Sequence, residues 1–279
     1  MVERRMLDRE LLEAEKIARV AGGIVMGLYD GGYDVAYKAK SDPVTEADTR
    51  ANAYIVDALR AAFPDDGIVA EETEDRTDAL RGGRCWFVDP LDGTKEFIAK
   101  NGEFAVMIGL AMEGVATLGV VYQPVGDKLY GGVVGDGASL EDGGERRPLT
   151  VSDVSDPSRL SLVVSRSHRG QPIDEVMDRL RITEERQRGS VGLKVGLIAE
   201  RAADLYVHMS NKSSAWDACG PEAILKAAGG RFTDLGGRAF DYRRAEMRNA
   251  RGILACNAEA FDAVLPVVED VARGVGLIR

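Results

Sequence analysis

Asp89-Pro90-Leu91-Asp92-Gly93-Thr94 is the most informative motif of this chain. It directly follows residues 85–88, an apolar run that predicts a buried β-strand. Its two carboxylates therefore stand at the end of a buried strand, where unpaired negative charge is costly. Hard divalent cations are suitable partners, because they prefer carboxylate and carbonyl oxygens as ligands. The motif thus predicts metal-assisted phosphate chemistry.

The overall charge of the chain limits its partners. The 279 residues carry a formal net charge of −10, which argues against binding to a nucleic acid polymer or an anionic membrane surface. No apolar run approaches the roughly 18 residues of a membrane span, so none is expected. Because a phosphate is also an anion, bound cations at the motif would reverse the local sign of the charge. We expect a small phosphorylated substrate as the partner.

The cysteines and the N-terminus indicate the compartment. Cys85, Cys219 and Cys256 are far apart and form neither a disulfide framework nor the spacing of a zinc site. Residues 1–8 turn acidic at once and contain no apolar signal region. We therefore expect a cytoplasmic protein whose cysteines are reduced and buried.

The first part of the chain predicts two helices followed by an antiparallel meander. Apolar residues recur at helical spacing over residues 8–29, and a second helix is expected over 45–63. Thr45 with Asp48 resembles a capping box at the start of the second helix. Runs rich in β-formers and separated by turn residues predict strands over 67–70, 104–110, 116–122 and 128–134.

A polar, glycine-rich segment over residues 135–148 is the best candidate for a domain boundary. Beyond it strands and helices alternate, which is typical of an α/β unit. The strands are expected over 160–164, 205–208, 231–233 and 252–256, and the helices over 172–180, 191–203, 215–228 and 258–271. We predict an N-terminal α+β half, residues 1–148, with most metal ligands. A C-terminal α/β half, residues 149–279, would complete the metal site and the substrate pocket.

Further acidic residues stand at the ends of apolar elements. Glu71 follows a short strand, Asp217 opens a helix, and Asp48 lies one turn into its helix. Taken singly, each has a simpler explanation: Asp92 would cap the short helix that follows it, Asp217 would cap its own helix, and Glu71 would be a surface residue. As a set they suit two metals, which need several carboxylates and at least one that bridges. Asp89 is well placed to be the bridging ligand.

The turn after the strand offers groups for the remaining steps. Leu91 could add its backbone carbonyl as a metal ligand. Gly93 and Thr94 would present backbone N–H groups to a phosphate at a helix start. The Thr94 hydroxyl could orient an attacking water, with Asp48 or Glu71 as the base.

Three motifs together resemble the signature elements of the inositol monophosphatase superfamily: Glu71-Glu72, the motif at residues 89–94, and Trp216-Asp217. The resemblance implies an α/β (α+β) fold, a layered αβαβα sandwich of the inositol monophosphatase and fructose-1,6-bisphosphatase type. It also implies a magnesium-dependent phosphomonoesterase with two or three Mg²⁺ ions per site and inhibition by Ca²⁺ and Li⁺.

The resemblance further implies a role for each site residue. The metal ligands are carboxylates or carbonyls at the ends of apolar elements: Glu71, Asp89 and the Leu91 carbonyl for the first metal, and Asp89, Asp92 and Asp217 for the second. Asp48 and Thr94 would activate the water, and the amides of Gly93 and Thr94 would bind phosphate.

Other segments resemble the CysQ branch of the superfamily, which comprises 3'(2'),5'-bisphosphate nucleotidases. They lie at residues 95–98, 101–104, 119–125 and 165–168. Members of this branch remove the 3'-phosphate from adenosine 3',5'-bisphosphate, a by-product of sulfate assimilation. The resemblance then implies substrate contacts from His168, Ser190, Lys194 and His208.

Some positions depart from the pattern of that branch. Val191 and Gly192 stand where it usually carries serines, and His208 stands where an arginine commonly helps to hold the second phosphate. A neutral histidine has one donor where arginine has five, which weakens the expected grip on a 5'-phosphate. Lys194 and Lys212 could compensate, or the substrate could carry less charge.

The sequence leaves three functions open. The favoured one is a nucleotidase that hydrolyses adenosine 3',5'-bisphosphate to AMP and phosphate, as a monomer or a homodimer. The alternative within the class is a broader phosphatase for inositol 1-phosphate, fructose 1,6-bisphosphate or NADP. Against inositol, Ser210 stands where inositol monophosphatases carry a glutamate that contacts the inositol hydroxyls. The alternative from another class is a non-catalytic divalent-metal-binding protein, which would not need the Asp48 and Thr94 pair.

Overall fold

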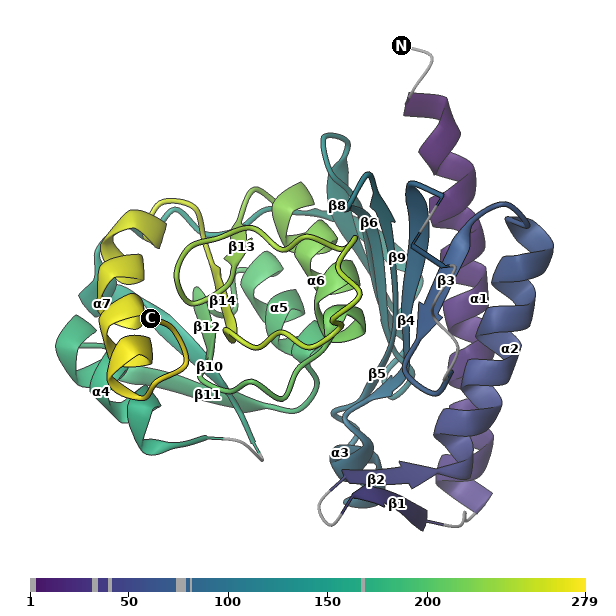
Figure 1. Cartoon of the computed structure of the whole chain (residues 1–279), viewed down its shortest axis with the longest axis horizontal. Coiled ribbons are helices and arrows are strands. Elements are labelled where there is room, and N and C mark those ends of the chain that lie inside the picture. The colour runs from purple at the N-terminus through teal and green to yellow at the C-terminus, as the bar shows by residue number, and fades with distance from the viewer. Residues whose placement is uncertain (1–3, 32–34, 40–41, 74–78, 81, 167–168) are drawn as a thin grey trace.

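Helices and sheets alternate through the molecule in five layers, as Figure 1 shows. The computed structural model describes residues 4–31, 35–39, 42–73, 79–80, 82–166 and 169–279. The layers are a helix pair, a seven-stranded sheet, a second helix pair, a five-stranded sheet and a third helix pair. This arrangement confirms the predicted αβαβα sandwich.

The first two layers come from the first half of the chain. Helices α1 (Arg4–Gly31) and α2 (Glu46–Ala62) cover one face of the seven-stranded sheet, and the hairpin β1 (Val35–Ala39) and β2 (Asp42–Thr45) leads into α2. The strands of the large sheet lie in chain order: β3 (Gly67–Ala70), β4 (Arg84–Asp92), β5 (Ala105–Met112), β6 (Val115–Gln123), β7 (Lys128–Val133), β8 (Gly137–Asp142) and β9 (Glu145–Leu149). Among the described strands of this sheet, β3 and β4 pair in parallel and the other neighbours pair antiparallel, so the predicted meander is confirmed.

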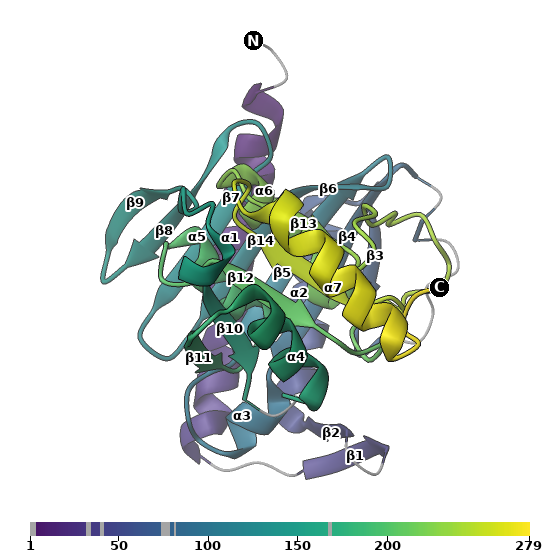
Figure 2. The same cartoon turned by 90° about the vertical axis from the view of Figure 1, so that its left-hand side faces the viewer.

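The second half of the chain forms the remaining layers. The five-stranded sheet has the order β11-β10-β12-β14-β13, and Figure 2 shows α4 and α7 lying across its outer face. Its strands are β10 (Ser161–Ser165), β11 (Glu184–Arg188), β12 (Leu205–His208), β13 (Arg231–Thr233) and β14 (Ile253–Cys256). The helices are α4 (Gln171–Leu180), α5 (Val191–Ala199), α6 (Ala215–Ala227) and α7 (Phe261–Gly274), with the single turns α3 (Thr94–Ile98) and η1 (Pro157–Arg159).

Strand β4 is buried on both faces and carries the acidic motif into the interior. Trp86 and Val88 pack with α1 and α2, whereas Cys85 and Phe87 point to the opposite face and pack with α6. This alternation follows from the two-residue period of a strand. The predicted buried strand over residues 85–88 is therefore confirmed.

Helix α6 lies against the large sheet with backbone touching backbone. A Cβ atom added to Gly109 of β5 or to Gly119 of β6 would collide with the backbone of Gly220 in α6. The absence of three side chains brings the helix unusually close to the sheet, as glycine permits. The start of α6, with Asp217, is thereby held beside the end of β4.

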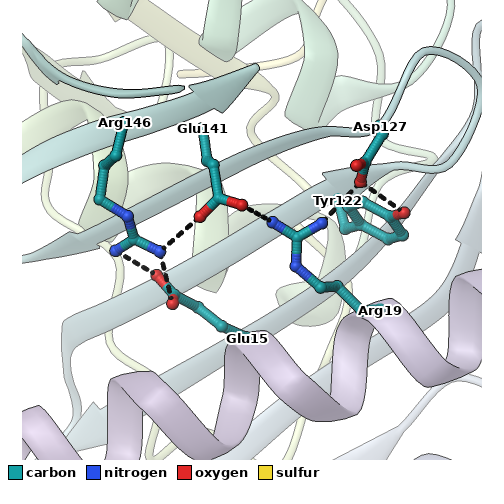
Figure 3. A network of polar contacts seen from close by, with 6 residues as sticks. All are labelled: Glu15, Arg19, Tyr122, Asp127, Glu141 and Arg146. Atoms are coloured by element: carbon teal, nitrogen blue, oxygen red, sulfur yellow. Dashed lines mark hydrogen bonds and ion pairs between the residues drawn. The ribbon is translucent and has the colours of Figure 1, made fainter. Parts of the chain in front are cut away.

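Residues 135–148, the polar segment at the predicted boundary, form part of the large sheet. They contain β8 and most of β9, and Ala138 and Leu140 are buried. The polar composition of this hairpin is typical of a linker, but its charged side chains form ion pairs with α1. Arg146 donates two hydrogen bonds to Glu15, at 3.0 and 2.8 Å, and Arg19 pairs with Glu141 at 2.5 Å (Figure 3). The division into halves at residue 148 stays a prediction.

Other elements were missed for local reasons. The hairpin of β1 and β2 is short, and β11 is a charged edge strand whose residues Glu184–Arg188 show no apolar alternation. Helix α5 ends at Ala199, earlier than expected.

In the described part of the chain, no helix combines the length and the apolar character needed to cross a membrane.

We predict that Gly119→Ala lowers the free energy of unfolding by about 1–3 kcal/mol, because the added methyl group forces α6 away from the sheet. Urea unfolding followed by circular dichroism measures this. The matched control is Gly27→Ala in α1, where nothing lies within 4 Å of the added Cβ. That variant should be neutral or more stable by up to about 1 kcal/mol. Equal effects of the two substitutions would contradict the close packing of α6.

Candidate active site

The acidic motif forms an irregular end of β4. Asp89 pairs with Met107 of β5 and Asp92 pairs with Ala105, and the register shifts between them. Within the turn, the Leu91 amide donates to Asp89 Oδ1 at 2.9 Å. Gly93 has a φ of 100°, which favours glycine, and α3 begins at the next residue. The chain therefore turns sharply while both carboxylates stay at the sheet end.

Three carboxylates meet at this point. One oxygen from each of Asp89, Asp92 and Asp217 lies within 4.8 Å of the others. Asp89 is only 2% exposed. Burial raises the pKa of Asp89 well above its ordinary value, and the charges of Glu71, Asp92 and Asp217 raise it further. Burial, followed by the charges of Asp92 and Glu71, raises the pKa of Asp217 to about 8.

This donor set fits a hard divalent cation. Buried or partly buried carboxylates at such short separations repel one another unless they are protonated or share a cation. Glu71 lies beside the group, because its amide donates to the carbonyl of Val88 at 3.0 Å and so continues the pairing of β3 with β4. The structure thus brings three of the four predicted acidic ligands together, and the charge of Glu71 acts on the pKa of Asp89 and of Asp217. Leu91 lies between Asp89 and Asp92 in the sequence.

Each of three site aspartates also binds the N-terminus of a helix. Asp48 is residue N3 of α2, and its Oδ2 accepts from the amide and the hydroxyl of Thr45 at 2.7 and 2.6 Å. Asp217 is residue N3 of α6, and its Oδ2 accepts from the Ser214 amide at 2.6 Å. The predicted capping box of Thr45 and Asp48 is confirmed. Helix capping and participation in the site are therefore compatible at these positions.

Asp92 makes the same kind of contact with a helix distant in sequence. Its Oδ2 accepts from the Ser190 hydroxyl and from the Val191 amide, each at 2.5 Å, and from the Gly192 amide at 3.2 Å. These groups are at the start of α5. The alternative that Asp92 caps the short helix directly after it is wrong, because Gly93 occupies that cap position without a side-chain bond.

Thr94 and Asp48 form a second pair next to the carboxylate group. The Thr94 hydroxyl lies 3.1 Å from Asp48 Oδ1 and 3.3 Å from the Leu91 carbonyl. Burial raises the pKa of Asp48, although its bonds from Thr45 oppose the rise. A carboxylate with a raised pKa is a stronger base, and Thr94 directs its hydroxyl at that base.

Of the side chains predicted to contact the substrate, those that the structure describes make contacts within the protein. Lys194 is 3% exposed, and its Nζ donates to the Ser190 carbonyl at 2.5 Å and lies 5.0 Å from the centre of the Tyr206 ring. Burial lowers the pKa of Lys194 to about 8, although nearby carboxylates, first Asp92, oppose this. His208 Nδ1 is 3.2 Å from the Tyr206 hydroxyl. The role predicted for His168 falls outside the described residues.

Sequence reasoning gave no role to an ion pair beside the site. Arg166 donates from Nε and Nη2 to Glu103, at 2.9 and 2.8 Å, and Glu103 Oε2 also accepts from the Gly189 amide at 2.8 Å. Both residues occur in segments that resembled the CysQ branch. The signal was therefore present, but the pairing joins residues 63 positions apart and has no local pattern.

Comparisons with known proteins find similar proteins over most of this chain. The model of the inositol monophosphatase family matches residues 7–271. The 3'(2'),5'-bisphosphate nucleotidase CysQ of Escherichia coli K12 is 39% identical over 236 residues, which cover 83% of this chain and 93% of that protein.

Solved structures show the same architecture. The IMPase of Thermotoga maritima is 28% identical, with a TM-score of 0.79 over 94% of this chain and 98% of that chain. CysQ of Bacteroides thetaiotaomicron, a bacterial member of the inositol monophosphatase family, is 26% identical, with a TM-score of 0.74 over 90% of this chain and 97% of that one.

We predict that the metal-free protein loses stability as the pH rises from about 4 to 8. Asp217 has a raised pKa when folded, so between 3.8 and about 8 the folded state retains a proton that the unfolded chain releases. The unfolded state then binds fewer protons, and the free energy of unfolding falls with pH. Mg²⁺ should therefore raise the unfolding temperature by at least about 2 °C more at pH 8 than at pH 5.

Differential scanning fluorimetry with and without Mg²⁺ measures this difference. Asp217→Asn is the control, because it has no carboxyl to titrate at that position and its Mg²⁺-induced shift should depend less on pH. An identical shift at both pH values in the unsubstituted protein would contradict the interpretation.

Proposed function

The chain belongs to the inositol monophosphatase family, and we propose that it is a Mg²⁺-dependent 3'(2'),5'-bisphosphate nucleotidase that converts adenosine 3',5'-bisphosphate to AMP and phosphate. The observation that carries the reaction class is the meeting of Asp89, Asp92 and Asp217 within 4.8 Å. Family membership confirms the resemblance seen in the sequence. The nucleotidase assignment is supported by the 39% identity to a protein of that name.

The convergence of Asp89, Asp92 and Asp217 supports the metal ligands that the family resemblance implies. Glu71, Asp89 and the Leu91 carbonyl would hold one Mg²⁺, and Asp89, Asp92 and Asp217 would hold a second. When bound, divalent cations supply an acidified water nucleophile and charge neutralisation at the leaving oxygen. Ca²⁺ and Li⁺ would act as inhibitors at the same ligands. A cytoplasmic location and a monomeric or dimeric state complete the proposal.

The protein's own groups would move the proton. The Thr94 hydroxyl donates to Asp48 Oδ1, so its oxygen lone pairs face away from that bond and can accept from an attacking water. Asp48 then receives the proton through Thr94, and its raised pKa suits this role. The amides of Gly93 and Thr94 would hold the phosphate at the turn after β4. A protein that only bound metal would not need this pair.

The choice of substrate depends on side chains other than the metal ligands. Lys194 is buried and its Nζ binds the Ser190 carbonyl, so we infer that it contributes positive charge to the site without contacting the substrate. His208 is joined to Tyr206 and offers a weaker contact than arginine to a 5'-phosphate. That observation favours, as a second candidate, a phosphatase for less charged inositol or sugar phosphates.

We predict that Asp48→Asn lowers kcat by about 10²–10⁴-fold while Mg²⁺ binding is retained, because the substitution removes the base and leaves the metal ligands intact. Phosphate release and isothermal titration calorimetry with Mg²⁺ measure the two properties. The control is Asp57→Asn on the same helix, whose side chain is 81% exposed and which should keep full activity. Full activity of Asp48→Asn would exclude this residue as the base.

We predict that adenosine 3',5'-bisphosphate is hydrolysed with a kcat/KM about ten- to hundredfold higher than inositol 1-phosphate. A hydrogen bond to a charged second phosphate contributes about 1.5–3 kcal/mol. A panel that also contains fructose 1,6-bisphosphate and NADP makes the comparison. His208→Arg should lower KM for the bisphosphate nucleotide alone. Preference for inositol 1-phosphate would replace the nucleotidase assignment with the broader phosphatase.

A further inference from the structure

Ser190 has an unusual backbone conformation. It is the N-cap of α5, is 4% exposed, and has φ 55° and ψ 137°. Arg181, at the end of α4, also has a positive φ but with a ψ of 34°, which is the ordinary left-handed region. The combination at Ser190 lies outside that region and is occupied mainly by glycine. The serine is therefore held in a strained conformation.

Contacts on both sides keep Ser190 in that conformation. Before it, the Gly189 amide donates to Glu103 Oε2 at 2.8 Å, and a side chain at Gly189 would overlap Glu103. Arg166 fixes that glutamate through two hydrogen bonds. After it, Lys194 Nζ binds the Ser190 carbonyl at 2.5 Å. Strain of this kind persists only where the surroundings determine it.

The strained conformation directs several donors at one atom. The Ser190 hydroxyl and the amides of Val191 and Gly192 all bind Oδ2 of Asp92. The hydroxyl also accepts from the Leu193 amide at 3.2 Å, which caps α5. A glycine at this position would relieve the strain and keep both amides, but it would lack the hydroxyl. What the serine adds is a contact with a predicted metal ligand.

We propose that Ser190 is a positioning residue for Asp92, and that its hydroxyl fixes the carboxylate in the orientation that binding of a divalent cation requires. This inference rests on the proposed function, because it assumes that Asp92 is a metal ligand. It gives Ser190 a role different from the substrate contact predicted from sequence. It also connects the large sheet with the middle helix layer, because Asp92 ends β4 and Ser190 is the N-cap of α5.

Two substitutions separate strain from positioning. Ser190→Gly removes the hydroxyl and relieves the backbone, and glycine is an acceptable N-cap, so the unfolding temperature should stay equal or rise. Ser190→Ala removes the hydroxyl and keeps the strain, so the unfolding temperature should fall. Both variants should bind Mg²⁺ about tenfold more weakly, the usual loss when a residue that orients a metal ligand is removed. Isothermal titration calorimetry with Mg²⁺ and scanning fluorimetry give the two readouts.

Arg181→Gly is the control, because it relieves a positive φ at an exposed helix end and should leave Mg²⁺ affinity unchanged. Mg²⁺ affinity at the unsubstituted level in Ser190→Gly would overturn the positioning role. So would a loss confined to Ser190→Ala, because affinity would then follow stability alone. If the unsubstituted protein binds no Mg²⁺, the proposed function and this inference both fail. If it binds Mg²⁺ and both variants bind equally well, only this inference fails.

Discussion

Repulsion among buried carboxylates is the constraint on which the site depends. Asp89, Asp92 and Asp217 converge at the end of β4, where burial and neighbouring negative charges raise the pKa of Asp89 and of Asp217. The protein stabilises part of this charge with helix N-termini, whose free N–H groups and dipoles favour anions. Asp92 binds the start of α5, and Asp217 binds the start of α6. In each of these two aspartates, Oδ2 accepts a hydrogen bond from a backbone amide at the start of a helix.

The layered fold brings these helix ends to one place. Helix α6 contacts the large sheet through glycine backbones, and this close contact fixes the position of Asp217 relative to β4. The bond from α5 to Asp92 fixes the second helix of that layer. Helix α2 approaches from the opposite face of the sheet and supplies Asp48, which reaches Thr94. The site lies where three layers meet, and no single layer contains it.

The sequence was sufficient where the determining pattern is local. The continuous apolar run over residues 85–88 predicted a buried strand, and the spacing of Thr45 and Asp48 predicted a capping box. It was insufficient where distant residues decide. The hairpin of β8 and β9 has the composition of a linker, and its partners on α1 lie more than 100 positions away. The bond from Ser190 to Asp92 spans 98 positions, and a backbone φ leaves no mark in the composition.

The ion pairs between α1 and the β8–β9 hairpin have a consequence for biosynthesis. Glu15 leaves the ribosome before Arg146, its partner, which is made 131 residues later. Until then α1 carries a glutamate that its final environment buries to 8% exposure, and the helix cannot dock without leaving that charge uncompensated. Translation at about 5–20 residues per second makes this delay several seconds or more. We therefore expect α1 to complete its packing against the large sheet only after the β8–β9 hairpin has been made.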